Sequence, residues 1–191
     1  RPGLDPDSVD DQHAVGSIGL SYSGLENLVL WSTLSQGYAA PTLINLATGA
    51  FAGPDFVNPN LDLDPERSNS LDVGGRLNTE YLELDTTFFY TEAKDYIDHL
   101  LCSQAGVVCI SPSVGRRDRV YVNIDEVKSF GAEAAMSFVL LDEVTPYATV
   151  SWIRRRFDSR NESTYETGIP SLTSRVGLLF EYEPRFDRRL W

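Results

Sequence analysis

The amino-acid sequence predicts an all-β protein, folded as part of an antiparallel up-and-down transmembrane β-barrel with about seven to eight strands in the chain. Three observations lead to this prediction. Apolar and polar residues alternate along most of the chain, the connections are alternately short and long, and the strand faces suit lipid outside and water inside. We expect all of residues 1–191 to belong to one barrel domain.

The alternating segments define the strands. In the segment 81–91, YLELDTTFFYT, the side chains of Leu82, Leu84 and Phe88 share one face, and those of Glu83 and Asp85 share the other. Enrichment in Tyr, Phe, Val and Thr supports the same assignment. Strands are expected at about 14–23, 28–38, 69–77, 81–97, 120–140, 144–157 and 174–183, with a further one starting at 188–191.

The connections come in two sizes that take turns along the chain. In an up-and-down sheet, all the short turns then lie at one end and all the long loops at the other, as in outer-membrane barrels. The short connections are 24–27, 78–80, 141–143 and 184–187, and the long ones are 39–68, 98–119 and 158–173.

The strand faces favour a wet interior over a dry core. In strand 174–183, Val176, Leu178 and Phe180 share one face, whereas Arg175 and Glu181 share the other. An unpaired ionised carboxylate is costly to bury in a dry core, but a water-filled lumen accepts it. The residues expected to face the lumen, where they pair with one another or with a plug domain, are Asp72, Arg76, Glu133, Arg175 and Glu181.

Composition excludes several classes of function. A net charge of −12 and a pI near 4.5 argue against nucleic acid as a partner, and no apolar run approaches the roughly 20 residues of a transmembrane helix. The two histidines, His13 and His99, make no usual zinc set with the cysteines. With no nucleophile elbow and little material for acid–base chemistry, we expect neither an enzyme nor a metal site.

Cys102 and Cys109 are the only cysteines. Six residues separate them, one of which is a glycine, and such a pair is most simply a local disulfide in an oxidising compartment. A loop of this size would contribute about 2.5 kcal/mol to stability. The alternative is a pair of reduced thiols.

Five motifs, in this order, resemble the C-terminal part of the barrel of TonB-dependent outer-membrane receptors. The resemblance covers about residues 15 to 183. Its departures are Tyr38-Ala39-Ala40 where the family has Phe-Arg-Ala, two extra residues before Pro65, and Asp72 where the family has Glu. The motifs are SQGYAAP (35–41), NPNLDLDPERS (58–68), SLDVG (70–74), FFYTEAKDYI (88–97) and YVNIDEVKSFGAE (121–133).

This resemblance implies a barrel of about 22 strands in the outer membrane of a Gram-negative bacterium, with a plug domain that this chain lacks. It implies uptake of an iron complex with energy from TonB, which acts through the missing plug. The expected partners are outer-membrane lipid, lipopolysaccharide, TonB and a small iron chelate. The iron complex is the transported cargo, and we expect no covalently bound cofactor.

A few polar residues bear on the prediction of which iron complex is transported. The segment 42–57 contains no histidine, which favours a ferric siderophore over haem, although His99 at the end of its strand is a possible axial ligand. A cluster of arginines at the loop ends of two strands is suited to an anionic ferric siderophore or to lipopolysaccharide phosphates, and both stay open. The cluster comprises Arg116, Arg117, Arg119, Arg154, Arg155 and Arg156.

Two other functions remain open. One is a small self-contained outer-membrane barrel of eight strands, acting as an anchor or an adhesin, in which the last strand closes on the first. The other is a soluble secreted β-sandwich that binds a partner through its loops. The sandwich would bury its apolar strand faces between two sheets.

Overall fold

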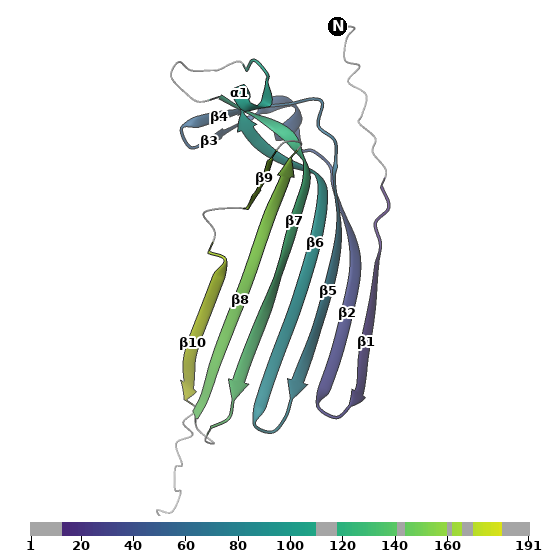
Figure 1. Cartoon of the computed structure of the whole chain (residues 1–191), viewed down its shortest axis with the longest axis vertical. Helices are drawn as coiled ribbons and strands as arrows, with labels where there is room; N and C mark the ends of the chain where they lie inside the picture. Colours follow the sequence, from purple (N-terminus) through teal and green to yellow (C-terminus); the bar gives the residue numbers. More distant parts are fainter. Residues whose placement is uncertain (1–12, 110–117, 141–143, 160–161, 166–169, 181–191) are drawn as a thin grey trace, which may run out of the picture.

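One antiparallel sheet makes up most of the structure (Figure 1). The computed structural model describes residues 13–109, 118–140, 144–159, 162–165 and 170–180. Each long strand pairs antiparallel with the next long strand along the chain, which confirms the predicted up-and-down topology. The long strands are β1 (Ser17–Leu25), β2 (Leu28–Ala39), β5 (Glu66–Asn78), β6 (Leu82–Leu101), β7 (Asp118–Phe138), β8 (Val144–Ser159) and β10 (Leu172–Phe180).

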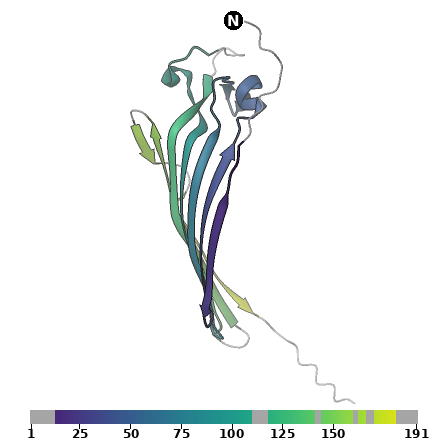
Figure 2. The ribbon, with the colours of Figure 1, turned by 90° about the vertical axis from the view of Figure 1, so that its right-hand side faces the viewer.

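The two ends of the sheet differ. Short elements gather at one end, here called the loop end, and the long strands form a single elongated layer below them (Figure 2). At the other end, the turn end, Leu25 pairs with Leu28 across a tight turn in which Asn27 has a φ of 62°. The short elements are the π-helix η1 (Ile44–Thr48), β3 (Ala50–Ala52), β4 (Asp55–Asn58), α1 (Cys102–Ala105) and β9 (Glu162–Tyr165).

The division of the connections by length is thus observed for the turns at 24–27 and 78–80 and for the long connections above them. The predicted turns at 141–143 and 184–187 lie outside the described residues.

Several strands extend further than alternation predicts. β5 begins at Glu66, β6 continues to Leu101 and β10 begins at Leu172. The long connection 39–68 also contains η1, β3 and β4, and β4 pairs in parallel with the start of β7. Contacts between distant residues produce these extensions, as when Glu66 Oε1 accepts the N–H of Ile97 at 2.7 Å.

One face of the sheet, here called the outer face, carries a charge-free zone that we call the apolar band. On β6 the band runs from Leu82 to Tyr90, which matches the roughly 9–11 tilted residues that cross a bilayer as a strand. Cross-strand pairing gives its members as Leu71, Val73, Gly75 and Leu77; Leu82, Leu84, Thr86, Phe88 and Tyr90; Phe130, Ala132, Ala134, Met136 and Phe138; Pro146, Ala148, Val150 and Trp152; and Leu172, Ser174, Val176 and Leu178.

Large apolar side chains of the outer face are exposed. Val176 is 80% exposed, Leu20 75%, Phe180 68% and Phe88 61%. A contiguous apolar surface of this kind is unfavourable in water and is the expected lipid contact of a membrane barrel. The predicted alternation, which places apolar and charged side chains of the sheet on opposite faces, is therefore observed. No helix among the described residues is long and apolar enough to cross a bilayer.

The opposite face, here called the inner face, carries the charged residues at the height of the apolar band. Asp72, Arg76, Glu133 and Arg175 all lie on it, whereas Glu181 lies outside the described residues. Arg76 pairs with Asp85 (Nε to Oδ1, 2.6 Å). That these side chains face a water-filled lumen or contact a plug domain remains a prediction.

The buried apolar side chains lie near the loop end rather than beneath the sheet. The buried apolar residues are Val57, Leu63, Cys102, Val120, Ile124 and Val127.

The β-sandwich alternative requires a second sheet packed on the first, and the described residues contain no second sheet. Among the described residues the sheet is also open at both edges, since β1 pairs only with β2 and β10 pairs only with β8.

Aromatic rings lie over glycines on the inner face. Phe89 stands directly opposite Gly131, and Trp31 directly opposite Gly74. A Cβ added to Gly131 would meet the Phe89 ring at 2.6 Å and would also clash with the carbonyl oxygen of Trp152. Glycine is therefore required at these positions, because it lets the aromatic ring lie flat against the neighbouring strand.

We expect Gly131→Val to destabilise the barrel by about 1–3 kcal/mol, because the added atoms overpack the contact with Phe89. The measurement is the loss of folded barrel with temperature in detergent. Ala135→Val is the matched control, since Ala135 is an exposed inner-face residue of the same strand. Equal stability of the two variants would contradict the steric argument.

Candidate functional site

A segment at the loop end, residues 55–65, runs alongside the first residues of β7 and is here called the strap. Its asparagines bind the main chain of β7 rather than its side chains. Asn58 Nδ2 donates to the carbonyl oxygen of Arg119 at 2.9 Å, and Asn60 Nδ2 donates to that of Tyr121 at 3.0 Å. The motif Asn-Pro-Asn-Leu therefore anchors the strap.

A third asparagine, Asn123, completes this attachment. Its Oδ1 accepts the N–H of Asp64 at 2.9 Å, and its Nδ2 donates to the carbonyl oxygens of Asp64 at 2.9 Å and of Asp95 at 2.6 Å. Val57 of the strap is 2% exposed, and Val120 of β7 is 7% exposed. Amide contacts and a small apolar core thus fix the loop end on β6 and β7.

Arg119, one of the predicted ligand-binding arginines, contacts the strap. Its Nε lies 3.1 Å from Asp55 Oδ2, and the two side chains are 32% and 16% exposed. This ion pair reinforces the parallel pairing of β4 with β7. Arg116 and Arg117 lie outside the described residues.

His99 lies at the loop end of β6, directly opposite Tyr121. Its Nδ1 lies 2.8 Å from Asp98 Oδ1, so this nitrogen already has a protein partner. Nearby, Cys102 and Cys109 form the predicted disulfide, with a Cα–Cα distance of 6.0 Å. The bridge closes the segment that follows β6.

Three predicted ligand-binding arginines, Arg154, Arg155 and Arg156, are divided between the two faces of β8. Arg154 lies on the outer face with its guanidinium 5.4 Å from the centre of the Tyr165 ring. Arg156 also lies on the outer face, where its Nε is 2.9 Å from Asp158 Oδ1. Arg155 alone of the three lies on the inner face.

Arg155 lines an open hollow of about 370 Å³ on the inner face below the strap. Its Nε donates to Ser129 Oγ at 3.2 Å. Its lining residues include two arginines (Arg67 and Arg155), two tyrosines (Tyr38 and Tyr96), three hydroxyl side chains and one glutamate, which is a set suited to a polar anionic ligand. Its polar and aromatic side chains include Glu66, Ser68, Thr91, Tyr96, Ser129 and Arg155.

An irregular residue places Tyr96 in this hollow. Asp95 has a φ of 56°, which interrupts the alternation of β6, so that Tyr96 lies on the same side as Thr91. The Tyr96 ring contacts that of Phe157 edge to face at a centroid distance of 6.2 Å. Tyr96 is not predictable as a site residue from the sequence, because a continuous alternation directs it outward.

A second hollow of about 540 Å³ lies closer to the turn end on the inner face. Glu133 accepts a hydrogen bond from Ser151 Oγ at 3.0 Å there, and Arg175 lines the same hollow. Two of the residues predicted to face the lumen, Glu133 and Arg175, are therefore brought together. Asp72 and Arg76 lie on neighbouring parts of the same face.

Charged residues also lie on the outer face, above the apolar band. Lys128 donates a short hydrogen bond to Glu126 Oε2. This contact is the main reason that the pKa of Glu126 is lowered and that of Lys128 is raised. Both groups are therefore charged at neutral pH.

Among the described residues, no three His, Cys, Asp or Glu side chains gather as metal ligands.

The TonB dependent receptor-like β-barrel family model matches residues 2–189 of this chain. A curated relative, the iron-regulated outer membrane virulence protein of Vibrio cholerae serotype O1, is 30% identical over 122 residues. That match covers 60% of this chain and 19% of the relative. The chain therefore spans about a fifth of the length of this relative.

Two solved structures share the fold. The copper transporter OprC superposes with a TM-score of 0.67 at 16% identity, covering 88% of this chain and 24% of OprC. The siderophore receptor PirA from Pseudomonas aeruginosa superposes with a TM-score of 0.60 at 14% identity, covering 85% of this chain and 34% of PirA. Because a copper transporter and a siderophore receptor handle different cargoes, the shared fold does not identify a ligand.

We expect the double variant Asn58→Ala/Asn60→Ala to loosen the strap. Loss of two amide hydrogen bonds corresponds to about 2 kcal/mol, which raises local opening about 30-fold. Amide hydrogen exchange of β4 measures this opening. Asn69→Ala is the control, since Asn69 is an exposed residue of β5 whose side chain accepts one long contact from Gln36 (3.4 Å). Unchanged exchange in the double variant would contradict the anchoring role.

Proposed function

The chain belongs to the TonB-dependent receptor β-barrel family, and from this membership we propose that it forms part of the barrel wall of a receptor that imports a ferric siderophore. The family and the curated relative place the chain in the outer membrane of a Gram-negative bacterium. In this proposal, energy from TonB acts through a plug domain that lies outside residues 1–191.

The polarity of the sheet carries this proposal. The apolar band occupies the outer face, whereas the inner face carries Asp72, Glu133 and Arg175 together with the two hollows. A wall of this kind separates lipid from a wet interior. The family is one of receptors, and the proposal ascribes no covalent chemistry to the chain.

The preference for a ferric siderophore over haem rests on side chains. The segment 42–57 offers no histidine to a haem iron. The hollow beside Arg155 presents a guanidinium and several hydroxyl groups, which suit an anionic chelate. Among the similar proteins, PirA is a siderophore receptor, and the curated relative is an iron-regulated protein.

The predicted arginine cluster takes two separate roles in this proposal. Arg155 faces the interior and contacts the anionic chelate as it passes the loop end. Arg154 and Arg156 face outward and meet lipopolysaccharide. Arg119 holds the strap through Asp55, while Arg116 and Arg117 remain candidate ligand contacts outside the described residues.

We expect Arg155→Gln, in the receptor that carries this chain, to weaken binding of an anionic ferric tris-catecholate about ten-fold. The physical reason is the loss of one charge-assisted interaction. Arg154→Gln is the matched control, because Arg154 neighbours Arg155 in β8 but lies on the outer face. The measurement is equilibrium binding of the radiolabelled chelate to outer membranes, followed by uptake into energised cells.

Two outcomes of this experiment would overturn the proposal. One is equal binding by wild type and Arg155→Gln. The other is an equal loss of binding for an uncharged ferric chelate, since that would show a general defect rather than the loss of a charge interaction.

A further inference from the structure

The outer face changes character directly above the apolar band. On β6 and β7 the band ends with the row that contains Tyr90 and Phe130, whereas on β8 that row already holds Arg154. Charged residues dominate the next two rows toward the loop end. Successive rows lie about 6.8 Å apart along a strand. The first charged row is Asn69, Glu92, Lys128 and Arg156, and the second is Arg67, Lys94, Glu126 and Asp158.

Two cations stand directly opposite each other in the second row. Arg67 of β5 pairs with Lys94 of β6, which places their Cβ atoms about 4.5–5.5 Å apart. Like charges in this arrangement destabilise a sheet. A bound anion between the two side chains would convert this repulsion into attraction.

Carboxylates of the protein offset this pair only in part. Lys94 Nζ lies 3.8 Å from Glu92 Oε1, and the Lys94 side chain is 62% exposed. Arg67 is exposed and makes no ion pair with any described residue. In the first row, by contrast, Lys128 contacts Glu126 and Arg156 contacts Asp158.

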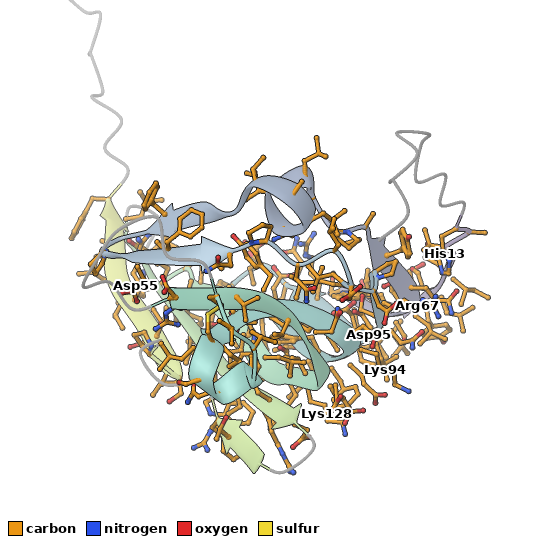
Figure 3. The ribbon with its side chains drawn as sticks, turned by 90° about the horizontal axis from the view of Figure 1, so that it is seen from above. His13, Asp55, Arg67, Lys94, Asp95 and Lys128 are labelled. Atoms are coloured by element: carbon orange, nitrogen blue, oxygen red, sulfur yellow. A yellow bond between two sulfur atoms is a disulfide. The ribbon has the colours of Figure 1, made fainter. Side chains whose placement is uncertain are left out.

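The surroundings of Arg67 add polar groups on the same side. Tyr38 stands opposite Arg67 on β2, and the ring of His13 stacks on that of Tyr38 at 4.4 Å. In the view from the loop end, His13 and Asp95 lie on the same side of the molecule as the two cations, Arg67 and Lys94 (Figure 3). No ion pair among the described residues joins Asp95 to either of them.

We propose that Arg67 and Lys94 form a binding site for the phosphate of a lipid headgroup in the outer leaflet. The proposal rests on the proposed function in one respect, which is that the apolar band lies in a bilayer. The hydrocarbon then ends at the Tyr90 row, so the headgroup layer meets the two charged rows. A guanidinium and an ammonium bind phosphate by charge-assisted hydrogen bonds.

The test measures lipid binding by the receptor barrel that carries this chain. The purified protein in detergent is titrated with diphosphoryl lipid A, and bound lipid is counted by native mass spectrometry. We expect Arg67→Gln/Lys94→Gln to weaken binding about ten-fold. Asp95→Asn is expected to strengthen it, because a neighbouring negative charge is removed while asparagine retains the positive φ.

Three controls test whether binding depends on the face of the sheet that carries the cation, on the phosphate groups of the lipid, and on a lipid rather than a free anion. Arg76→Gln removes a cation from the inner face of the same strand and is expected to leave lipid binding unchanged. Dephosphorylated lipid A is expected to bind wild type and the double variant equally. Inorganic phosphate, at the same concentration as the lipid, is expected not to displace it.

Equal affinity of wild type and the double variant for the diphosphoryl lipid would overturn the proposal. Displacement of the lipid by an equal concentration of inorganic phosphate would also overturn it, because the site would then bind a free anion. The gel mobility of the unheated variants verifies folding. Uptake of the ferric chelate is measured separately, so failure of the lipid site and failure of the transport proposal are distinguishable.

Discussion

The structure depends on one constraint, which is that main-chain N–H and C=O groups must find partners where no water can supply them. The long strands meet this constraint with continuous registers, such as that of β6 and β7 from Leu82–Phe138 up to Lys94–Glu126. A continuous register also fixes the alternation of side chains, so the hydrogen bonds that satisfy the backbone sort every side chain onto one face or the other. The apolar band, the inner face and the two charged rows all follow from this sorting of side chains.

The long strands were predictable because their alternation persists for many residues. η1, β3 and β4 were not, since each is too short to show a period and β4 depends on a parallel pairing with β7, a distant part of the chain. The extra length of β5 and β6 has a similar origin in contacts such as Glu66 with Ile97. Local pattern therefore identified the wall of the barrel, and tertiary contacts determined its loop end.

The candidate site was predictable in part. Arg154, Arg155 and Arg156 look like one cluster in the sequence, but successive residues of a strand point to opposite faces, and this rule alone separates Arg155 from its neighbours. The position of Tyr96 could not be foreseen, because it depends on the positive φ of Asp95. Arg67 and Lys94 are 27 positions apart in the sequence and become neighbours only through the register of β5 with β6.

The attachment of the strap through carbonyl oxygens has an evolutionary implication. Asn58 and Asn60 bind the main chain at positions 119 and 121, and every amino acid offers the same carbonyl group there. These two hydrogen bonds therefore survive a change of side chain at either position, although a change at position 119 also removes the ion pair with Asp55. Receptors built in this way can diversify their recognition surfaces while the scaffold that presents them stays constant.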